Sequence, residues 1–262
     1  MNYTFISGAT GGIGKAFTFS SAKRGENLFL TGRSENKLLA LKTQILEKHP
    51  NIQIEYFACD LTKEDSRKEM VEYIDKKGIT FSKILLVAGV DTQMAFLDYT
   101  EEKVLFQIRV NAESTISLTH ALLNRRAEKT ELLSISSMSG VSPMPYFALY
   151  SATKAMLTNF FTALHYELKD KGVKVTVVLP GGVPTREDII EDIKGQGLWG
   201  KLSSKSPEFV AEKSLKALSK NKLQYIPGGF NKFLNFIMKL APKRLKLRFI
   251  ARRWKKIKKD AF

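Results

Sequence analysis

The chain has 262 residues, enough for one large α/β domain or two small ones, and its 44% hydrophobic and 26% charged residues are ordinary for a folded protein. Its net charge of +16 is uneven: residues 222–262 hold 13 basic residues and 1 acid, a balance of +12, and the remainder of the chain has a balance of +4. A near-neutral body with a basic tail argues against a general nucleic-acid-binding surface and indicates a local surface for anions, lipid headgroups or a partner.

Short apolar runs rich in β-branched residues alternate with amphipathic stretches along the chain. Several runs are apolar throughout, which is typical of parallel strands covered on both faces. The alternation predicts an α/β fold, a doubly wound seven-stranded parallel sheet (Rossmann-like) flanked by helices. We expect strands at 3–7, 27–31, 52–58, 83–88, 131–136, 173–179 and 223–227. We expect helices at 12–24, 34–48, 62–77, 101–126, 150–171 and 207–219, in one domain at 1–228 followed by a tail at 229–262.

A glycine-rich turn, SGATGGIGKAF, directly follows the first predicted strand. Gly8, Gly12 and Gly14 open the first helix, whose exposed N–H groups and dipole favour a phosphate. A P-loop would need a glycine where Ala9 stands and a serine or threonine where Ala16 stands. The turn therefore predicts a dinucleotide site, the alternative being a glycine turn without a ligand.

The end of the second strand, LTGRSENK, bears on the choice of dinucleotide. An NAD site needs an acidic residue roughly 20 residues beyond the glycines, and Gly32 occupies that position. Arg33, Ser34 and Lys37 follow, and a guanidinium beside a hydroxyl suits a 2′-phosphate. We therefore favour NADP(H) over NAD(H), although Arg33 as a solvated loop residue is the alternative.

The third strand ends in ACDLT. Cys59, the single cysteine, excludes an intrachain disulfide, and we expect it in the core. Asp60 can cap the following helix at its N-terminus, and it can also reach an adenine amino group.

A tyrosine four residues ahead of a lysine can serve as a proton donor with its helper, because helical spacing puts both on one face. The chain contains this spacing three times, at Tyr73/Lys77, Tyr99/Lys103 and Tyr150/Lys154. Only the third pair follows a strand ending in Ser-Ser and precedes a strand ending in Pro-Gly. Strand ends of a parallel sheet share the carboxyl edge, where ligands bind, so we predict that the third pair carries the chemistry.

Taken in order, these motifs resemble those of the short-chain dehydrogenase/reductase family, in its single-domain form, from residue 3 to about residue 227. Ala88-Gly89 matches the end of the family's Asn-Asn-Ala-Gly element, although Leu86 and Val87 replace both asparagines. The resemblance implies a catalytic set of Ser137, Tyr150, Lys154 and Asn111. Together with the residues above, it implies cofactor contacts at Gly8, Thr10, Gly12, Ile13, Gly14, Arg33, Ser34, Lys37, Asp60, Leu61, Ala88, Gly89, Asn111, Tyr150, Lys154, Pro180, Gly181, Val183 and Thr185.

This set suits interconversion of a carbonyl and its secondary alcohol with NADP(H). We expect Tyr150 to be the general acid for reduction and the base for oxidation, with a pKa lowered by Lys154. We expect Ser137 to bond the substrate oxygen. The resemblance alone implies that Asn111 holds a water linked to Lys154. The alternative, from another class of protein, is a catalytically weak NADP-binding scaffold or sensor.

The segment 186–206 follows the Pro-Gly element, and we expect it to cover the substrate as an amphipathic lid hinged at Gly195 and Gly197. Its apolar residues indicate a hydrophobic or lipid-like ketone as the substrate. The alternative is that these side chains only pack against the rest of the domain. The first tail helix, at 230–241, has one broad apolar arc. The tail could close the active site or a dimer contact, or lie on an anionic membrane surface; nucleic acid is disfavoured.

The remaining signals concern compartment and partners. We see no signal-peptide pattern and no apolar stretch approaching the roughly 18–20 residues of a transmembrane helix. We expect a cytoplasmic protein, with membrane association through 229–262 left open, a small-molecule substrate and, from the resemblance, a homo-oligomer. His49, His120 and His165 are scattered, so we predict no metal site.

Overall fold

The computed structural model describes residues 1–255, apart from the side chain of Asp192. Its centre is a seven-stranded sheet in which every neighbouring pair is parallel, in the order β3-β2-β1-β4-β5-β6-β7. The strands are β1 (Asn2–Ser7), β2 (Leu28–Gly32), β3 (Ile54–Ala58), β4 (Thr80–Leu86), β5 (Arg126–Ile135), β6 (Val173–Val178) and β7 (Gln224–Tyr225). The order reverses between β1 and β4, and ligands bind at such a reversal. The predicted doubly wound parallel sheet is confirmed.

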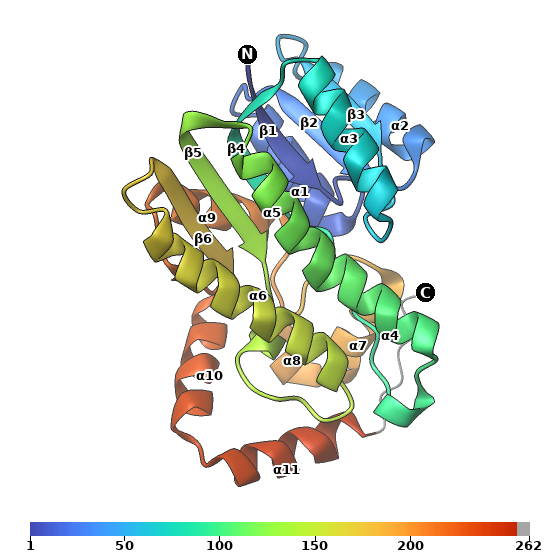
Figure 1. The fold of residues 1–262 in the computed structure, drawn as a ribbon. Helices are drawn as coiled ribbons and strands as arrows, with labels where there is room; N and C mark the ends of the chain where they lie inside the picture. The colour runs from blue at the N-terminus through green and yellow to red at the C-terminus, as the bar shows by residue number, and fades with distance from the viewer. Residues whose placement is uncertain (256–262) are drawn as a thin grey trace.

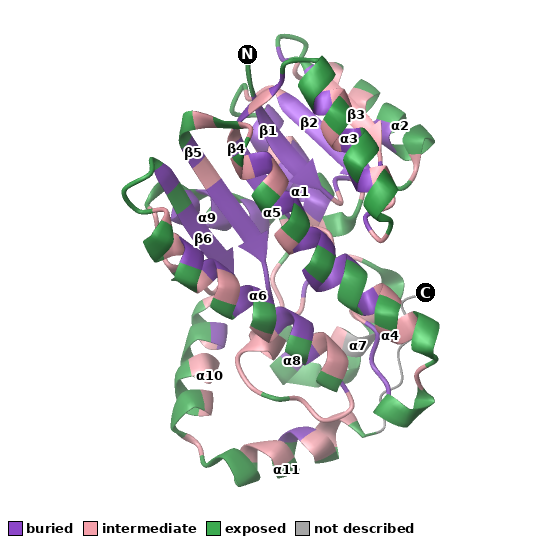
Figure 2. Cartoon of the chain, in the orientation of Figure 1, coloured by how far each residue is buried: buried purple, intermediate pink, exposed green. Residues whose placement is uncertain are grey.

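Helices cover both faces of this sheet (Figure 1). The helices of the body are α1 (Gly12–Ala22), α2 (Glu35–Leu46), α3 (Glu64–Lys76), α4 (Glu101–Ile108), α5 (Ser114–Leu123), α6 (Ala148–Glu167), α7 (Glu187–Gly195), α8 (Gly197–Ser203) and α9 (Pro207–Ser219). One core cluster joins the sheet to α3, α5 and α6, and the other joins it to α1, α2 and α9. Figure 2 shows the buried strands between these two layers.

Alternation along the strands separates the two cores. Phe5 of β1 packs against Phe29 and Phe81 on one face, with ring centroids 5.7 and 5.6 Å apart. The next residue, Ile6, belongs to the other cluster. Because β1, β2 and most of β4 and β6 are buried on both faces, the continuous apolar runs of these strands are explained. Cys59 is buried in the first cluster, as predicted.

The predicted helix at 101–126 is wrong in its continuity. The segment Arg109–Glu113 between α4 and α5 is π-helical, and β5 already begins at Arg126. A π-helical turn adds a residue to the helix and changes which side chains face inward. Here it buries Val110, Asn111 and Ala112.

The end of the described chain forms two further helices, α10 (Gly229–Leu240) and α11 (Lys243–Trp254). Figure 1 shows α10 running away from the sheet and α11 crossing beyond α8 at the same end of the molecule. The predicted lid segment consists of α7 and α8, joined at Gly197 with φ +58°. The tail and the lid therefore lie together beyond the carboxyl edge of the sheet.

Candidate active site

The glycine turn is a cradle that side chains would fill. Gly8 has φ +64°, and a Cβ there would lie 2.9 Å from the Cα of Ala88. A Cβ on Gly14 would meet the Gly8 carbonyl oxygen at 2.0 Å, and one on Gly12 would meet the Thr185 side chain at 2.5 Å. The turn therefore accepts only glycine where the backbone approaches both neighbouring strand ends, which fits a dinucleotide pyrophosphate at the start of α1.

The end of β2 presents cations and lacks an acid. Gly32 is buried, and a Cβ on it would lie 3.3 Å from the Thr10 hydroxyl. Arg33 and Lys37 are exposed beside it. The Ser34 hydroxyl caps α2 by accepting from the Lys37 amide at 3.4 Å. These residues fit a 2′-phosphate on the adenosine ribose.

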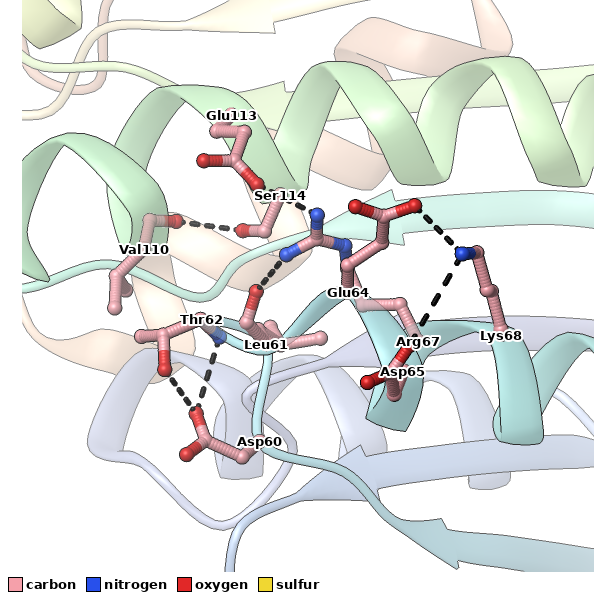
Figure 3. A network of polar contacts seen from close by, with 10 residues as sticks. All are labelled: Asp60, Leu61, Thr62, Glu64, Asp65, Arg67, Lys68, Val110, Glu113 and Ser114. Carbon is pink, nitrogen blue, oxygen red and sulfur yellow. Dashed lines mark hydrogen bonds and ion pairs between the residues drawn. The ribbon is translucent and has the colours of Figure 1, made fainter.

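Asp60 caps a turn rather than a helix, so the predicted helix-capping role is wrong (Figure 3). Its carboxylate accepts from the amide and hydroxyl of Thr62, at 3.0 and 2.7 Å, and the residue that precedes α3 is Lys63. Burial by itself raises the pKa of this carboxyl, but the Thr62 hydrogen bonds and the charges of Lys63 and Arg33 lower it below its usual value. Asp60 is thus an ionised acceptor near Arg33.

A buried arginine joins this turn to the π-helical segment, as Figure 3 shows. Arg67 of α3 donates to the Leu61 carbonyl and to the Glu113 carboxylate, both at 2.6 Å. The Arg67 side chain is only 8% exposed, and that of Glu113 is 45% exposed. Since Leu61 is a predicted cofactor contact, Arg67 relates the predicted adenine pocket to the segment that carries Asn111.

Asn111 is fully buried and clamps the loop after β4. Its side-chain oxygen accepts from the Val90 amide at 2.8 Å, and its amide donates to the Val90 carbonyl at 2.9 Å and to the Thr153 hydroxyl at 3.2 Å. A Cβ on Gly89 would lie 3.1 Å from the Lys154 ammonium and 3.3 Å from the Asn111 oxygen. The predicted residues Gly89, Asn111 and Lys154 therefore converge.

The missing asparagines at positions 86 and 87 are compensated locally. Leu86 is buried in the core, and the Val87 and Ala88 amides donate to the Ser7 hydroxyl at 2.9 and 3.2 Å. Ser7 at the end of β1 thus supplies a polar link between the two central strand ends, which the sequence analysis did not identify.

The three predicted catalytic side chains meet at the carboxyl edge. Tyr150 projects from the start of α6, its ring stacked on Phe147 with centroids 4.4 Å apart, and Ser137 beyond β5 is close enough to lower its pKa. The Lys154 ammonium lies 5.7 Å from the centre of the Tyr150 ring and donates to the Ile135 carbonyl at 3.0 Å. Lys154 is therefore held between the tyrosine and the end of β5.

Burial dominates the electrostatics of this pair. Burial, aided by the negative charge of Asp91, raises the pKa of Tyr150, while Ser137 and Arg186 oppose that rise. Burial also lowers the pKa of Lys154 to about 8, against a small opposing effect of Asp91. The predicted lowering of the Tyr150 pKa by Lys154 is therefore wrong for the chain by itself, because desolvation outweighs the neighbouring charges.

An ion pair that the sequence did not reveal lies near the predicted catalytic residue Tyr150. Arg186 contacts Asp91 at 2.9 Å and Asp188 at 3.0 Å. The arginine directly follows Thr185 at the start of the lid, and Asp91 lies in the loop after β4. The sequence offered one signal: Asp91 and Arg186 carry opposite charges, and each adjoins a predicted motif. Only the fold, however, brings these two segments together.

The other two tyrosine–lysine pairs have structural roles elsewhere. The Tyr73 hydroxyl donates to Glu55 at 2.6 Å, and the Tyr99 hydroxyl donates to the Thr92 carbonyl at 2.8 Å. Neither tyrosine adjoins a serine-bearing strand end as Tyr150 does, so the structure separates the three occurrences by location.

The Pro-Gly element continues from β6 beneath the tail. The Pro180 carbonyl accepts from the Met138 amide at 2.9 Å, which ties the ends of β5 and β6 together. A Cβ on Gly181 would lie 2.7 Å from the Asn231 amide nitrogen of α10. The predicted apolar contacts Ile13 and Val183 are half-buried and buried.

A cavity of about 260 Å³ lies between the loop before α4, the segment before α6 and the tail. Its lining is mostly apolar and consists of Met94, Ala95, Phe96, Tyr99, Pro145, Tyr146, Ala148, Leu149 and Ala251. Leu149 immediately precedes Tyr150, and Ala251 belongs to α11. Another cavity, of about 500 Å³, lies beside α1 and touches Gly12 and Thr185; Ser137, Tyr150 and Lys154 line neither cavity.

Within residues 1–255, no group of three or more His, Cys, Asp or Glu side chains is placed to hold a metal ion. No helix of that described part combines the length and the apolar character needed to cross a bilayer.

Comparison with known proteins relates the whole arrangement to one family. The family model for short chain dehydrogenases matches residues 2–190. Over 222 residues the chain is 32% identical to the very-long-chain 3-oxoacyl-CoA reductase of Bos taurus, covering 82% of the chain and 68% of the relative. Over 188 residues it is 31% identical to the 17-beta-hydroxysteroid dehydrogenase type 3 of Rattus norvegicus, covering 70% and 60%. The match spans only 54% of the reductase from Vanderwaltozyma polyspora, so the chain corresponds to part of such relatives.

Solved structures show the same fold over nearly the full length. A 7beta-hydroxysteroid dehydrogenase superposes with a TM-score of 0.85 at 25% identity, covering 95% of this chain and 96% of that protein. A short-chain dehydrogenase from Sphingobium yanoikuyae in complex with NADPH gives a TM-score of 0.75 at 21% identity, covering 93% and 97%. The second likeness concerns the fold alone.

Proposed function

This chain belongs to the short-chain dehydrogenase/reductase family, and from that premise we propose that it interconverts a hydrophobic ketone and its secondary alcohol with NADP(H). The observation that carries the proposal is the convergence of Ser137, Tyr150 and Lys154 at the carboxyl edge of the sheet, next to a glycine cradle. The cradle and the cations after β2 fit the cofactor, and the apolar cavity beside Leu149 fits the substrate class.

Reduction of a ketone needs hydride at carbon, which the nicotinamide supplies when bound, and a proton at oxygen. Tyr150 provides that proton from its hydroxyl and takes it back during oxidation. The high pKa of Tyr150 in the chain alone keeps the hydroxyl protonated, which suits reduction. Ser137, which lies near the tyrosine, donates to the substrate oxygen as negative charge develops there.

Lys154 and Asn111 hold the remaining parts of the site. Lys154 would hold the nicotinamide ribose when the cofactor is bound, and its ammonium lies 5.7 Å from the centre of the Tyr150 ring. Asn111 fixes the loop after β4 through Val90 and orients Thr153 on the helix that carries the lysine. The predicted water-holding role of Asn111 remains part of this proposal.

We also propose NADP(H) rather than NAD(H). Arg33 and Lys37 are exposed at the end of β2 without a carboxylate at position 32, so they can neutralise the two negative charges of a 2′-phosphate. A homo-oligomer in the cytoplasm, as expected from the resemblance and the single cysteine, belongs to the same proposal; gel filtration tests the assembly.

The apolar cavity favours a ketone with a bulky or extended hydrocarbon part. Its volume of about 260 Å³ exceeds what a small polar carbonyl fills, and the lining is dominated by Met, Ala, Phe, Pro and Leu side chains. The named relatives are reductases of very-long-chain 3-oxoacyl-CoA and hydroxysteroid dehydrogenases, which agrees with this class.

Replacement of Tyr150 by Phe should abolish NADPH oxidation with a panel of long-chain and polycyclic ketones, because it removes the proton donor without changing the ring stacked on Phe147. NADPH binding, followed by cofactor fluorescence, should persist. Tyr73→Phe serves as the control: it removes the hydroxyl of another tyrosine that stands four residues ahead of a lysine, and activity should be retained. Full turnover by Tyr150→Phe would contradict the assignment, and cofactor binding without turnover by the native chain would favour a scaffold or sensor.

A further inference from the structure

The first tail helix packs on the body with a side that includes two asparagines. Asn231 is only 2% exposed and donates to the carbonyls of Ser203 and Pro227 at 2.8 and 3.0 Å. Asn235, one turn later, is half-buried. Phe230, Leu234 and Met238 are also half-buried, and the Phe230 ring lies 5.1 Å from that of Trp199, so α10 buries only part of its apolar surface on its own chain.

The opposite side of α10 is apolar and exposed. Its members recur at the i, i+3, i+4 and i+7 spacing of one helical face, and each is 44–69% exposed: Phe233, Phe236, Ile237 and Leu240. Such a face normally lies in the core, and a contiguous exposed apolar patch marks an interaction site. The exposed side of α10 therefore carries apolar residues that a helix serving only to close the fold would bury.

The second tail helix extends this surface. Leu245 and Phe249, one turn apart on α11, are 60% and 57% exposed. The inward side is fixed by the buried Ile250 and by Arg253, which lies 5.5 Å over the Trp199 ring and donates to Gln196 at 3.2 Å. The apolar residues that point outward on both helices form what we call the tail surface.

Positive charge surrounds the tail surface. Between residues 229 and 255 the sequence has no acid and nine basic residues, namely Lys232, Lys239, Lys243, Arg244, Lys246, Arg248, Arg252, Arg253 and Lys255. A two-fold contact between copies would place the same basic patch on both sides, and the like charges would repel. Nucleic acid would leave the exposed phenylalanines and leucines without an apolar partner.

We propose that the tail surface binds an anionic lipid bilayer, with the exposed apolar residues inserted among the headgroups and the basic residues against their phosphates. Aromatic and aliphatic side chains on one helical face with flanking Lys and Arg are the composition that binds such interfaces. The arrangement adds a binding surface that the catalytic site does not require.

The tail surface also adjoins the apolar cavity, because Ala251 of α11 lines it. On a bilayer, that cavity lies next to the phase in which a hydrophobic ketone dissolves. This consequence rests on the proposed function, whereas the lipid binding does not and is measured without substrate.

Co-sedimentation of the full chain with vesicles tests the proposal. We expect binding to vesicles containing phosphatidylglycerol, little binding to phosphatidylcholine alone, and a marked loss on raising the salt concentration. The double variant Phe233→Ser/Phe236→Ser should weaken binding by about tenfold or more, because two exposed rings no longer enter the bilayer. Lys239→Gln/Lys243→Gln should weaken it and reduce its salt dependence.

Matched variants elsewhere provide the controls. Leu39→Ser/Tyr166→Ser removes two other exposed apolar side chains, and Lys129→Gln/Lys171→Gln removes two exposed lysines of the body. Both should bind vesicles like the native chain. Equal binding to neutral and anionic vesicles, or equal losses in tail and control variants, would overturn the proposal. An absence of vesicle binding would also overturn it, whether or not the chain forms a dimer that Phe233→Ser/Phe236→Ser dissociates. Turnover of a water-soluble ketone without vesicles reports separately on the catalytic function.

Discussion

Replacing Arg67 with Met should destabilise the fold by about 2–3 kcal/mol, although the residue touches no predicted catalytic group. The guanidinium donates at 2.6 Å both to the Leu61 carbonyl and to Glu113, and the side chain is 8% exposed. Met fills most of the same space, so the main loss is polar. The Leu61 carbonyl, in a residue 7% exposed, loses its partner at a cost of about 1–3 kcal/mol.

The ion pair itself contributes less. Glu113 is 45% exposed and regains water when Arg67 is removed, so its share is up to about 1 kcal/mol rather than the larger cost of isolating a buried charge. For a chain of this size, a loss of about 2 kcal/mol lowers Tm by roughly 4–8 °C. Urea unfolding followed by circular dichroism measures the change, and NADPH affinity should fall severalfold because the Asp60–Leu61 turn loosens.

The neighbouring Lys68 supplies the control (Figure 3). It pairs with Glu64 at 2.7 Å, but the two side chains are 62% and 70% exposed. Lys68→Met should therefore leave the urea midpoint close to that of the native chain, because solvent screens this exposed pair. If Arg67→Met costs no more than Lys68→Met, burial does not govern the value of these contacts and the reasoning is refuted.

Three further predictions concern the site. Arg33→Ala should weaken NADPH far more than NADH; a parallel loss of both would contradict the 2′-phosphate assignment. Arg186→Gln removes a positive charge that lowers the Tyr150 pKa, so the pH profile of alcohol oxidation should shift to higher pH. Asp91→Asn removes a negative charge that raises this pKa, so the profile should shift to lower pH. Shifts of both profiles in the same direction would count against this reasoning. Burial lowers the Lys154 pKa to about 8 from 10.5, so the unfolded chain binds more protons between those values and native stability rises with pH there. Lys154→Met, which we expect to be inactive, should therefore be more stable than the native chain at pH 7, and this difference in stability should shrink towards pH 10.5. A constant difference across that range would refute burial of the ammonium as the cause.

Much of the fold was predictable because its determinants are local. Continuous apolar runs identified the parallel strands, and the helix predicted at 207–219 is α9, which begins at Pro207 after Ser206, whose hydroxyl accepts from the Phe209 amide at 3.2 Å. The location of Tyr150, among three similar pairs, beside Ser137 at the carboxyl edge was also predictable, because the order of strand ends along the chain implies which of them share that edge.

The sequence by itself thus determined the sheet, its helices and the residues brought to its carboxyl edge, since periodicity, capping and motif order are properties of short segments. The π-helical turn at Asn111, the Arg186–Asp91 pair and the turn made by Asp60 were decided by tertiary structure. The clearest case is α10, whose composition does not define which of its residues are buried, since Phe233 and Phe236 are exposed while Asn231 is buried. Asn231 faces inward because the surface it meets offers carbonyl oxygens, and only the folded chain creates that surface.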